Sequence, residues 1–434
     1  MTDWIRRHVL VTSLLVLFCS LSVRMFIALR QDPTELVDVY SDARSYLGPA
    51  TTLLEHGTFV NNHGKPEIQR TPGYPLFLAV IMTAAGADLR RMLLIQTAIL
   101  AVGPLILYVL ARRILPPVPA LVGSLIAAVS PWGAVLASAP LSDGLFLILL
   151  TLAFLAMNVA ANSPAVTAGF SAAALGVITG VAVLVRPIWP LVILVPAAFL
   201  FYTWPKPKGT RLLVIVILIC ALAPVALWRE RNRREAHFAS ISDIAGETAW
   251  HYLAARVRGE LSGQDRFQLN TLAAQEEQNW GLPRWSQAVD DERWRQANAV
   301  FKAHPFLTAY AFTRSAGEHM IHPSPDVLGP ARLNFRGDYL VLAVIWGTLM
   351  LSAVYGLVGL NTAADRYDIA IDGRLVVVML AICLLITLSS GISFGAGSRL
   401  RAPLEAVVPL LAALGFTRLF GCACTASVAD SRVE

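Results

Sequence analysis

Charged residues are scarce in this sequence. Only 15% of its 434 residues are Asp, Glu, Lys or Arg, and 56% are hydrophobic, whereas a soluble domain carries about 25% charged residues. Long apolar runs recur along the chain, so the composition excludes an ordinary soluble protein and predicts a polytopic helical membrane protein. The net charge of +6 is small and is spread among the loops. It suits anionic headgroups better than nucleic acid, so we expect membrane lipids and no nucleic acid among the partners.

Cysteine is also scarce, and the common catalytic motifs are missing. The five cysteines indicate no disulfide framework, and Cys422 and Cys424 alone make a poor metal site because two thiols are too few. The sequence has no GxGxxG followed by a helix, no Walker motif, no HExxH and no GxSxG. These absences argue against nucleotide-cradling loops, zinc hydrolases and nucleophile-elbow hydrolases. No convincing internal repeat is present, which disfavours a transporter built from inverted repeats.

The apolar segments predict ten full membrane spans and one short segment. The first segment runs from about His8 to Leu29 and has no cleavage site after it, so we expect a retained helix. Arg6 and Arg7 precede it, and the positive-inside rule therefore puts the N-terminus in the cytoplasm. The other apolar segments are Gly73–Ala87, Met92–Val109, Pro119–Ala137, Pro140–Ala161, Val166–Val185, Ile188–Trp204, Leu212–Trp228, Tyr339–Leu360, Leu375–Phe394 and Pro403–Phe420.

The segment Gly73–Ala87 decides the topology, because it is shorter than the roughly 20 residues that a full crossing needs. We expect it to be re-entrant or to continue, broken, into the next helix. Arg112, Arg113 and the C-terminal tail are then cytoplasmic, and the extracytoplasmic side holds Asp42, Asp143, Arg186, Arg399 and Arg401. Arg90 and Arg91, which lie between the two pieces, argue against this topology.

We therefore divide the chain into three regions. Residues 1–228 form an N-terminal transmembrane region with a first extracytoplasmic loop at 30–72. Residues 229–337 form an extracytoplasmic loop region, and its four tryptophans and amphipathic patterns predict helices that lie over the membrane face. Residues 338–434 form a C-terminal transmembrane region with a cytoplasmic tail.

The first polar stretch, residues 40–76, predicts a short amphipathic helix on the membrane surface. Tyr46, Leu47, Ala50, Leu53 and Leu54 follow the spacing of one apolar stripe, and Gly57 is a suitable C-terminal stop. Such a helix is too short and too polar to span, so it would hold the carboxylate of Asp42 at the water–lipid boundary.

Charged residues stand at the outer ends of several apolar segments. Asp42 and Asp143 are each compatible with a solvated or helix-terminal acid, and the arginines are each compatible with lipid anchoring. Together, two carboxylates and Arg186, Arg399 and Arg401 on one side provide a base and cations for a phosphodiester or diphosphate headgroup. The apolar helices around them are suited to a lipid tail.

These residues resemble a known family. The run Asp42, Tyr46, Ala50, Leu53, Gly57 and Phe59, followed by Arg70 and PGYPLF, resembles the first extracytoplasmic loop of GT-C glycosyltransferases. The similar branch is the ArnT-like and protein O-mannosyltransferase superfamily (glycosyltransferase family 39-like), whose donors are polyprenyl-phosphate sugars. The likeness continues in order along nearly the whole chain in LARR (110–113), Ser130–Pro131, LSDGLF (141–146), GVAVLVRP (180–187), AHPF (303–306) and RLRAPLEAVVPLLAALG (399–415).

The resemblance implies an all-α, polytopic GT-C bundle with an extracytoplasmic helical loop domain. It implies catalytic roles for Asp42 and Asp143 and a position near the donor phosphate for Arg399 and Arg401; Arg70 and Arg186 are further candidates to stabilise the leaving phosphate, and Tyr46 and Tyr74 to shape the pocket. The aminoarabinose branch has Glu-Lys-Pro-Pro where this chain has residues 69–72, Gln-Arg-Thr-Pro. Gln69 thus replaces an acid associated with a metal, and a divalent metal stays an open alternative.

The sequence therefore predicts an inverting glycosyltransferase that moves a sugar from a polyprenyl phosphate to a protein, lipid or glycan acceptor. Its expected location is the bacterial inner membrane, with the active site on the extracytoplasmic face. A transporter or flippase for a lipid-linked sugar is the alternative, since it would need the same arginines for binding. The identities of the sugar and of the acceptor, the oligomeric state and whether Gly73–Ala87 spans are not predicted.

Overall fold

Helices form at almost all the long apolar runs that fall within the described part of the chain. The computed structural model describes residues 2–86, 88–188, 193–194, 196–198, 207–321, 338–359, 373–393 and 397–430. In this part of the chain the only β-pairing is one isolated antiparallel bridge between Val60 and Pro66. The protein is therefore all-α, as the sequence predicts.

The helices of the first half are α1 (Thr2–Arg7), α2 (Val9–Arg30), α3 (Pro33–Val39), α4 (Ser41–His56), α5 (Gly73–Ala85), α6 (Leu89–Leu100), α7 (Gly103–Ile114), α8 (Pro117–Val129), α9 (Pro131–Ser138), α10 (Asp143–Asn162), α11 (Ala165–Val185) and α13 (Pro207–Ala236). Those of the second half are α14 (Ile244–Thr248), the π-helix η1 (Ala249–Ala254), α15 (Ala255–Ser262), α16 (Arg266–Gln278), α17 (Gln287–Ala303), α18 (Pro305–Ile321), α20 (Asp338–Val358), α22 (Gly373–Ser389), the 3₁₀ helices η3 (Ser390–Ile392) and η4 (Gly397–Ala406), and α23 (Val408–Asp430).

Six helical segments of the described chain are long and apolar enough to cross a membrane, or eight if each of two bent pairs is one span. The bent pairs are α8 with α9 and the end of η4 with α23, each at 53°. The prediction of ten spans also included Tyr339–Leu360, where α20 has a shorter apolar part. Its remaining span, Ile188–Trp204, lies mostly outside the described residues.

The segment 73–87 forms a 13-residue helix, α5, which ends at Gly86. At 1.5 Å per residue it rises about 20 Å, less than the ~30 Å hydrocarbon core of a bilayer. It packs against α4, α6 and α11. After it, α6 and α7 together make one 26-residue candidate span, Leu89–Ile114. The short helix thus does not reach across a membrane by itself, in agreement with the topology adopted from the sequence.

The break between α8 and α9 is stabilised by a buried arginine. Pro131 cannot donate to the helix ladder, so carbonyl groups before it lose their partners. Arg24 of α2, only 3% exposed, donates from Nη1 to the carbonyl of Ala128 at 2.7 Å and from Nη2 to that of Ala127 at 3.4 Å. A guanidinium inside the bundle therefore serves the polar groups that the bend releases.

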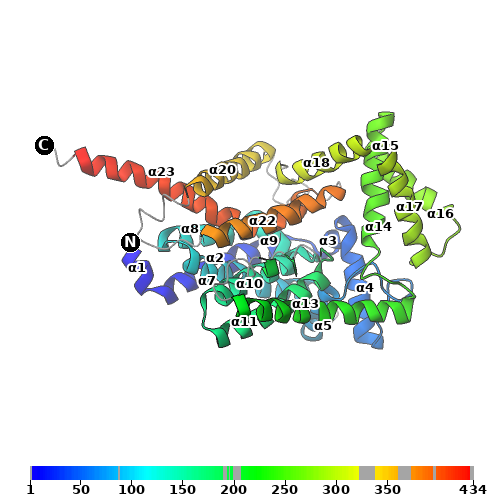
Figure 1. Ribbon diagram of the computed structural model, residues 1–434, viewed down its shortest axis with the longest axis horizontal. Coiled ribbons are helices and arrows are strands. Elements are labelled where there is room, and N and C mark those ends of the chain that lie inside the picture. Colours follow the sequence, from blue (N-terminus) through cyan, green and yellow to red (C-terminus); the bar gives the residue numbers. More distant parts are fainter. Residues whose placement is uncertain are drawn as a thin grey trace.

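The helices α14 to α18 lie together at one end of the molecule, and the two chain termini lie at the other (Figure 1). These outer helices have two small cores of their own, built around Trp250 and Val257, separate from the large core of the bundle. Helix α13 leads toward them and continues to Ala236, past the predicted boundary at residue 228. We refer to residues 244–321 as the outer helical unit.

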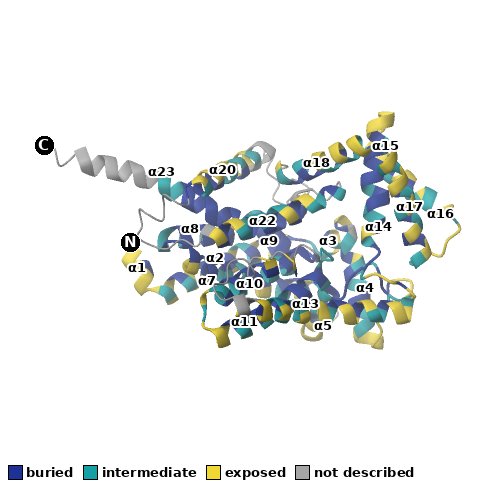
Figure 2. Cartoon of the chain, in the orientation of Figure 1, coloured by how far each residue is buried: buried dark blue, intermediate teal, exposed yellow. Residues whose placement is uncertain are grey.

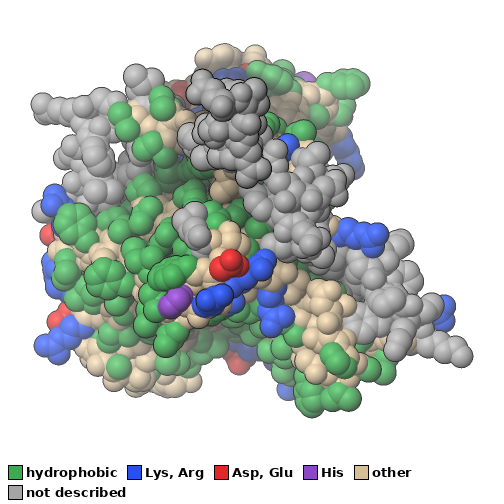
Figure 3. Space-filling view, turned by 90° about the vertical axis from the view of Figure 1, so that its left-hand side faces the viewer, with side chains coloured by type: hydrophobic (Ala, Val, Ile, Leu, Met, Phe, Trp, Pro, Cys, Tyr) green, Lys and Arg blue, Asp and Glu red, His purple; other side chains and the backbone are tan. Residues whose placement is uncertain are grey.

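Buried residues concentrate where the bundle helices meet, while their outward faces alternate between intermediate and exposed positions (Figure 2). The exposed large side chains on the bundle helices are mostly apolar, for example Phe18 at 69% and Phe170 at 76%. The face at the end that carries the termini shows broad areas of hydrophobic side chains with Lys and Arg between them (Figure 3). The apolar outward faces of the bundle helices suit contact with lipid.

Replacing Gly176 by alanine is expected to destabilise the pair α11 and α13. A Cβ at this position would stand 2.6 Å from the carbonyl oxygen of Ile217 and 2.6 Å from Cβ of Cys220. Overpacking of this kind costs about 1–3 kcal/mol, so the thermal unfolding midpoint in detergent should fall. Gly169→Ala is the control on the same helix, since nothing lies within 4 Å of its added Cβ. Equal midpoints for the two variants would contradict the tight packing.

Candidate active site

Helix α4 holds Asp42 in its first turn and ends at Gly57, whose φ of 65° is left-handed. The amphipathic helix predicted for this stretch is therefore present. Its buried face is turned slightly from the predicted stripe, since Ala43, Tyr46 and Ala50 are buried while Leu54 is 43% exposed. This rotation presses the start of the helix against the bundle, which directs Asp42 inward.

Asp42 and Asp143 belong to one chain of ion pairs with three arginines. Arg70 Nη2 donates to Asp42 Oδ1 at 2.6 Å, and Arg399 Nη2 donates to Asp42 Oδ2 at 2.5 Å. Arg399 Nε also lies 3.3 Å from Asp143 Oδ2, and Arg186 Nη1 donates to Asp143 Oδ1 at 2.6 Å. Side chains separated by as many as 357 positions thus meet. We call these five residues the charge cluster.

Two glycines of the sequence motifs allow this approach. A Cβ on Gly144, next to Asp143, would stand 2.5 Å from the carbonyl oxygen of Leu136 in α9. A Cβ on Gly73, at the start of α5, would stand 2.6 Å from the carbonyl oxygen of Leu184, two residues before Arg186. The backbones therefore come closer than a larger residue permits, and they carry the charged side chains into one place.

The two tyrosines expected in the pocket, Tyr46 and Tyr74, pack beside the charge cluster. The Arg70 guanidinium lies 4.8 Å from the ring centroid of Tyr46, a cation–π contact. The Tyr46 hydroxyl is 3.1 Å from Ser142 Oγ, and its ring meets Tyr74 edge-on at 4.9 Å. Tyr74 is fully buried and donates to Gln96 Oε1 at 2.8 Å. Tyr46 therefore touches the cluster directly, and Tyr74 acts through Tyr46.

Arg401, which the sequence groups with Arg399, has different surroundings. It is 1% exposed, and its guanidinium lies 3.9 Å from the ring centroid of Trp346 and 5.0 Å from that of Trp132. Its segment, η4, is a 3₁₀ helix with about three residues per turn. Residues two positions apart therefore point to different sides, so Arg399 reaches the aspartates while Arg401 packs between tryptophans.

The charge cluster changes the acidity of Asp42. Burial by itself raises the pKa of a carboxyl group, but the guanidinium groups of Arg70 and Arg399 outweigh it and hold the pKa of Asp42 well below its usual range. Both carboxylate oxygens accept from an arginine. In this arrangement Asp42 is ionised and a weak base, and it becomes a stronger base when an arginine leaves it for another anion.

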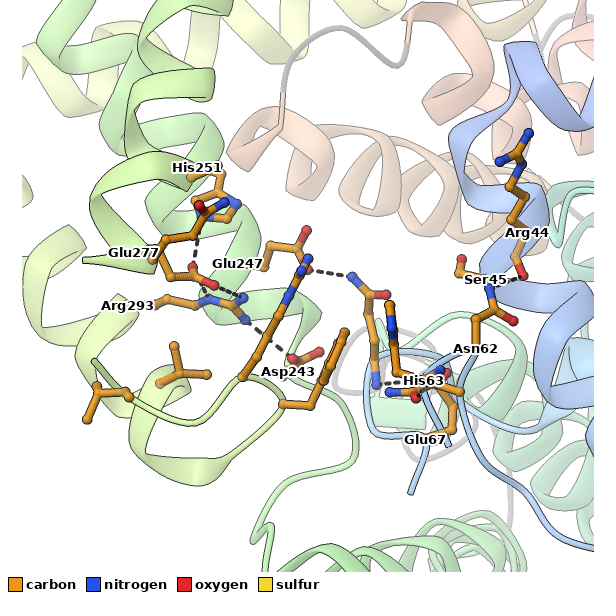
Figure 4. A pocket seen from close by; sticks show the side chains of 18 of the residues that line it. Arg44, Ser45, Asn62, His63, Glu67, Asp243, Glu247, His251, Glu277 and Arg293 are labelled. Carbon is orange, nitrogen blue, oxygen red and sulfur yellow. Dashed lines mark hydrogen bonds and ion pairs between the residues drawn. The ribbon is translucent and has the colours of Figure 1, made fainter. Parts of the chain in front are cut away.

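A cavity of about 480 Å³ lies beside the charge cluster, between the first loop and the outer helical unit. Its labelled side chains come from both parts, with Arg44 and Ser45 on α4 and His251, Glu277 and Arg293 on the outer helices (Figure 4). Asp42 does not line it, but Ser45 does, and Ser45 Oγ accepts from Arg70 Nε at 2.8 Å. Gln69, the neighbour of Arg70, also lines it. The cavity and the cluster thus share a wall.

The pKa values of two acids that line this cavity, Asp243 and Glu277, are shifted in opposite directions. Burial raises the pKa of Asp243 to about 7, because Arg293 offsets it only in part. Burial raises the pKa of Glu277 too, but its hydrogen bonds from His251 and Arg293 lower it to about 2. The first acid is partly protonated at neutral pH, and the second is ionised.

Glu277→Gln is expected to weaken the outer helical unit by about 2 kcal/mol at pH 7, because it removes a charged, twofold hydrogen bond. Arg293 donates to Glu277 from Nε and from Nη2, each at 2.7 Å. The folded pKa of Glu277 is depressed, so this stabilisation is present above the unfolded pKa of about 4.3 and disappears as the pH falls toward 2. Amide hydrogen exchange of α16 and α17 should show the full difference at pH 7 and a smaller one at pH 3, where Glu277 in the folded protein is still mostly ionised. Glu292→Gln, which breaks an exposed pair with Arg295, serves as the control, and an equal effect there would refute the assignment.

The acid that the sequence lacks at position 69 is not replaced by Glu67. Glu67 Oε1 accepts from the backbone N–H groups of Gln69 and Arg70 at 2.6 and 2.8 Å, so it shapes the loop. Gln69 Nε2 donates to Glu247 Oε2 at 2.6 Å. Within the described ranges no group of three or more His, Cys, Asp or Glu side chains is placed to hold a metal ion. The groups that contact Asp42 are the guanidinium groups of Arg70 and Arg399. These cations do not fit a divalent metal.

Several residues of the site escape the sequence analysis. Ser45 was detectable, since it follows Asp42 by three positions and so shares its helix face. Ser142 and Gln96 are visible only once the helices are packed. Asp243 and Glu247 come from the region in which the sequence offers no motif, about 170 residues beyond Gln69.

Comparison with known proteins gives matches of two kinds. Residues 69–228 match the family described as dolichyl-phosphate-mannose-protein mannosyltransferase. No curated protein sequence matches the chain. Among solved structures, the oligosaccharyltransferase AglB from Archaeoglobus fulgidus, in complex with an inhibitory peptide and a dolichol-phosphate, has a TM-score of 0.55 at 11% identity. That match covers 99% of this chain and 52% of AglB.

The A. fulgidus oligosaccharyltransferase in the apo form has a TM-score of 0.56 at 12% identity, over 98% of this chain and 52% of that one. ArnT from Cupriavidus metallidurans in the apo state has a TM-score of only 0.40 at 17% identity, over 96% of this chain and 78% of ArnT. The chain thus spans about half the length of the oligosaccharyltransferase it matches. The family match over residues 69–228 and the fold shared with the oligosaccharyltransferase agree with the resemblance found in the sequence.

Proposed function

Because this chain has the GT-C fold and matches a mannosyltransferase family over residues 69–228, we propose that it is an inverting glycosyltransferase. Its donor is a sugar on a polyprenyl phosphate, and the transfer takes place on the extracytoplasmic face of a membrane. The observation that carries the proposal is the charge cluster, in which Asp42 and Asp143 are joined by Arg70, Arg186 and Arg399.

The reaction is a single displacement at the anomeric carbon. An acceptor hydroxyl attacks this carbon while Asp42 takes the hydroxyl proton, and the bond from the carbon to the phosphate oxygen breaks with its electron pair on the oxygen. The leaving polyprenyl phosphate gains one negative charge. Arg399 and Arg70 donate hydrogen bonds to that charge as it develops, which is the kind of stabilisation that lowers a barrier most.

The cluster also explains how a strongly acidic aspartate serves as a base. Without donor, Asp42 holds two arginines and its pKa is depressed. A phosphate group competes for the same guanidinium forks, which bind phosphate oxygens in pairs. When Arg399 turns to the phosphate, Asp42 loses one cation and its basicity rises. Asp143, which holds Arg186 at 2.6 Å and Arg399 at 3.3 Å, keeps both arginines oriented. Donor binding thus activates the base.

The positions of the helices indicate on which side of the membrane the charge cluster lies. Helix α4 and the outer helical unit are at one end of the molecule, and the N-terminus, with Arg6 and Arg7 close after it, is at the other (Figure 1). The positive-inside rule supports a cytoplasmic N-terminus, and therefore an extracytoplasmic charge cluster. A bacterial inner membrane is the location we propose.

Transfer in detergent distinguishes an enzyme from a flippase. The purified full-length protein, mixed in detergent with a radiolabelled polyprenyl-phosphate sugar and an extract of cell-envelope acceptors, is expected to form labelled product. A flippase needs a sealed bilayer, whereas an enzyme does not. Absence of product in detergent, together with donor movement across proteoliposomes, would establish the transporter instead.

A further inference from the structure

The cavity beside the charge cluster has a size and a position suited to an acceptor. Its volume of about 480 Å³ lies within the range of about 300–1,000 Å³ typical of small-molecule sites. Ser45 lines it and holds Arg70, which binds Asp42. Two hydrogen bonds, both made by Arg70, therefore connect the cavity wall at Ser45 to the carboxylate that the proposed reaction uses as a base.

Two buried polar atoms on the cavity wall have no hydrogen-bond partner among the described residues. They are Nδ2 of Asn61, a residue 8% exposed, and Oδ1 of Asp243, a residue 1% exposed. The first is a donor, and the second, when ionised, is an acceptor. An unpaired buried polar group costs about 1–3 kcal/mol, so the pair indicates a ligand that both donates and accepts. A hydroxyl group does both.

The cavity also presents one aromatic ring in an unusual backbone conformation. Trp285 has a φ of 56°, which a bulky residue adopts only when its surroundings hold it there. Its ring stands 4.5 Å from that of His63, at 30°. Arg284 lies 4.8 Å from the same ring centroid. The constrained backbone holds a half-buried indole ring in the cavity wall, and an indole ring is a suitable partner for the C–H face of a sugar ring.

The residues that line the cavity disfavour an anionic ligand or an acyl chain. Arg293 is bound by Glu277 and Asp243, and Arg44 is bound by Asp38. The carboxylate of Glu247 has the neutral amide of Gln69 as its partner. The wall holds four carboxyl groups and three arginines, so it offers an anion no excess of cations. An acyl chain needs apolar walls, whereas most residues that line this cavity are polar.

From this arrangement we infer that the cavity binds the acceptor, and that the acceptor is an uncharged, hydroxyl-rich saccharide. The role of this saccharide as an acceptor rests on the proposed function. Asn61 donates to one hydroxyl, Asp243 accepts from another, and Trp285 stacks on the ring. A hydroxyl at the Ser45 side of the bound saccharide faces the charge cluster.

Binding can be measured without catalysis. The full-length protein in lipid nanodiscs is immobilised and exposed to an equimolar mixture of neutral di- to tetrasaccharides of glucose, mannose, galactose and N-acetylglucosamine. A tryptic digest of serum albumin is added as a peptide competitor. Eluted molecules are identified and counted by mass spectrometry. Saccharides should be retained, and peptides should not.

Three variants test two residues of the cavity wall. Asn61→Asp keeps Oδ1, which accepts from the backbone N–H groups of His63 and Lys65, but loses the donor. Trp285→Ala loses the ring, and Trp285→Phe keeps an aromatic face. Retention is expected to fall at least tenfold for N61D and W285A and to stay within threefold of the wild type for W285F. Trp4→Ala, at an exposed tryptophan near the N-terminus, is the control and should bind as the wild type does.

The results distinguish saccharide binding in the cavity from the sugar-transfer reaction. Asp42→Asn should retain saccharides even though transfer is lost. If the wild-type protein retains saccharides but transfers no sugar, the cavity is a saccharide site and not an acceptor site. Retention of no saccharide, retention of peptides instead, or equal retention by N61D and the wild type overturns the inference. Because N61D preserves the turn, it decides the question even if W285A does not fold.

Discussion

Asp42→Asn is expected to reduce sugar transfer by about 10²- to 10⁴-fold, the usual contribution of a positioned base. The amide has nearly the same shape as the carboxylate but takes no proton from an acceptor hydroxyl. The donor should still bind, because the substitution frees Arg70 and Arg399 from a carboxylate that competes with phosphate. We therefore expect kcat to fall while KM for the donor stays equal or decreases.

The matched control for this variant is Asp38→Asn. Asp38 lies four residues before Asp42, and its exposed carboxylate pairs with Arg44. Initial rates with purified proteins of equal thermal stability give the comparison. Full transfer by D42N, or an equal loss in D38N, would remove Asp42 as the base.

Arg399→Gln is expected to lower kcat by about 10²- to 10³-fold, as loss of a donor to a developing oxyanion does elsewhere. Arg399 is the one cluster residue that contacts both aspartates, at 2.5 Å from Asp42 and 3.3 Å from Asp143. Its removal takes away a cation for the leaving phosphate and leaves two buried carboxylates with less compensation. Arg399→Lys keeps the charge but loses the planar fork, so we expect a smaller but clear loss.

Arg91→Gln removes an arginine that pairs with the exposed Asp88 and does not line the cavity, and it should leave the rate within a factor of two. Rates measured over a range of donor concentrations separate binding from chemistry. If R399Q behaves as R91Q does, the phosphate is stabilised by other groups.

Much of the fold was predictable because hydropathy and charge act locally. The apolar runs predicted most of the helices, and the shortness of the 73–87 segment indicated the topology that brings Asp42, Asp143 and Arg399 to one side. Five of the six charged candidates form the charge cluster. Their positions near helix ends predicted that they would gather on one side, but not which residue pairs with which.

The remaining features depend on properties that a single sequence does not display. The 3₁₀ geometry of η4 separates Arg401 from Arg399, and a hydropathy profile has no signal for it. The bends of 53° inside two apolar pairs also leave the hydropathy high. The cavity wall joins residues near position 65 to residues near 245 and 285, and the left-handed backbone of Trp285 is a product of packing.

The guanidinium of Arg24 has a consequence for how the chain enters the membrane. Its acceptors, the carbonyls of residues 127 and 128, are synthesised about a hundred residues after it. A charge in a lone helix costs a few kcal/mol in lipid, so α2 gains stability in the bilayer when α8 supplies these carbonyl groups. The membrane integration of the first helix is therefore coupled to that of a helix made much later.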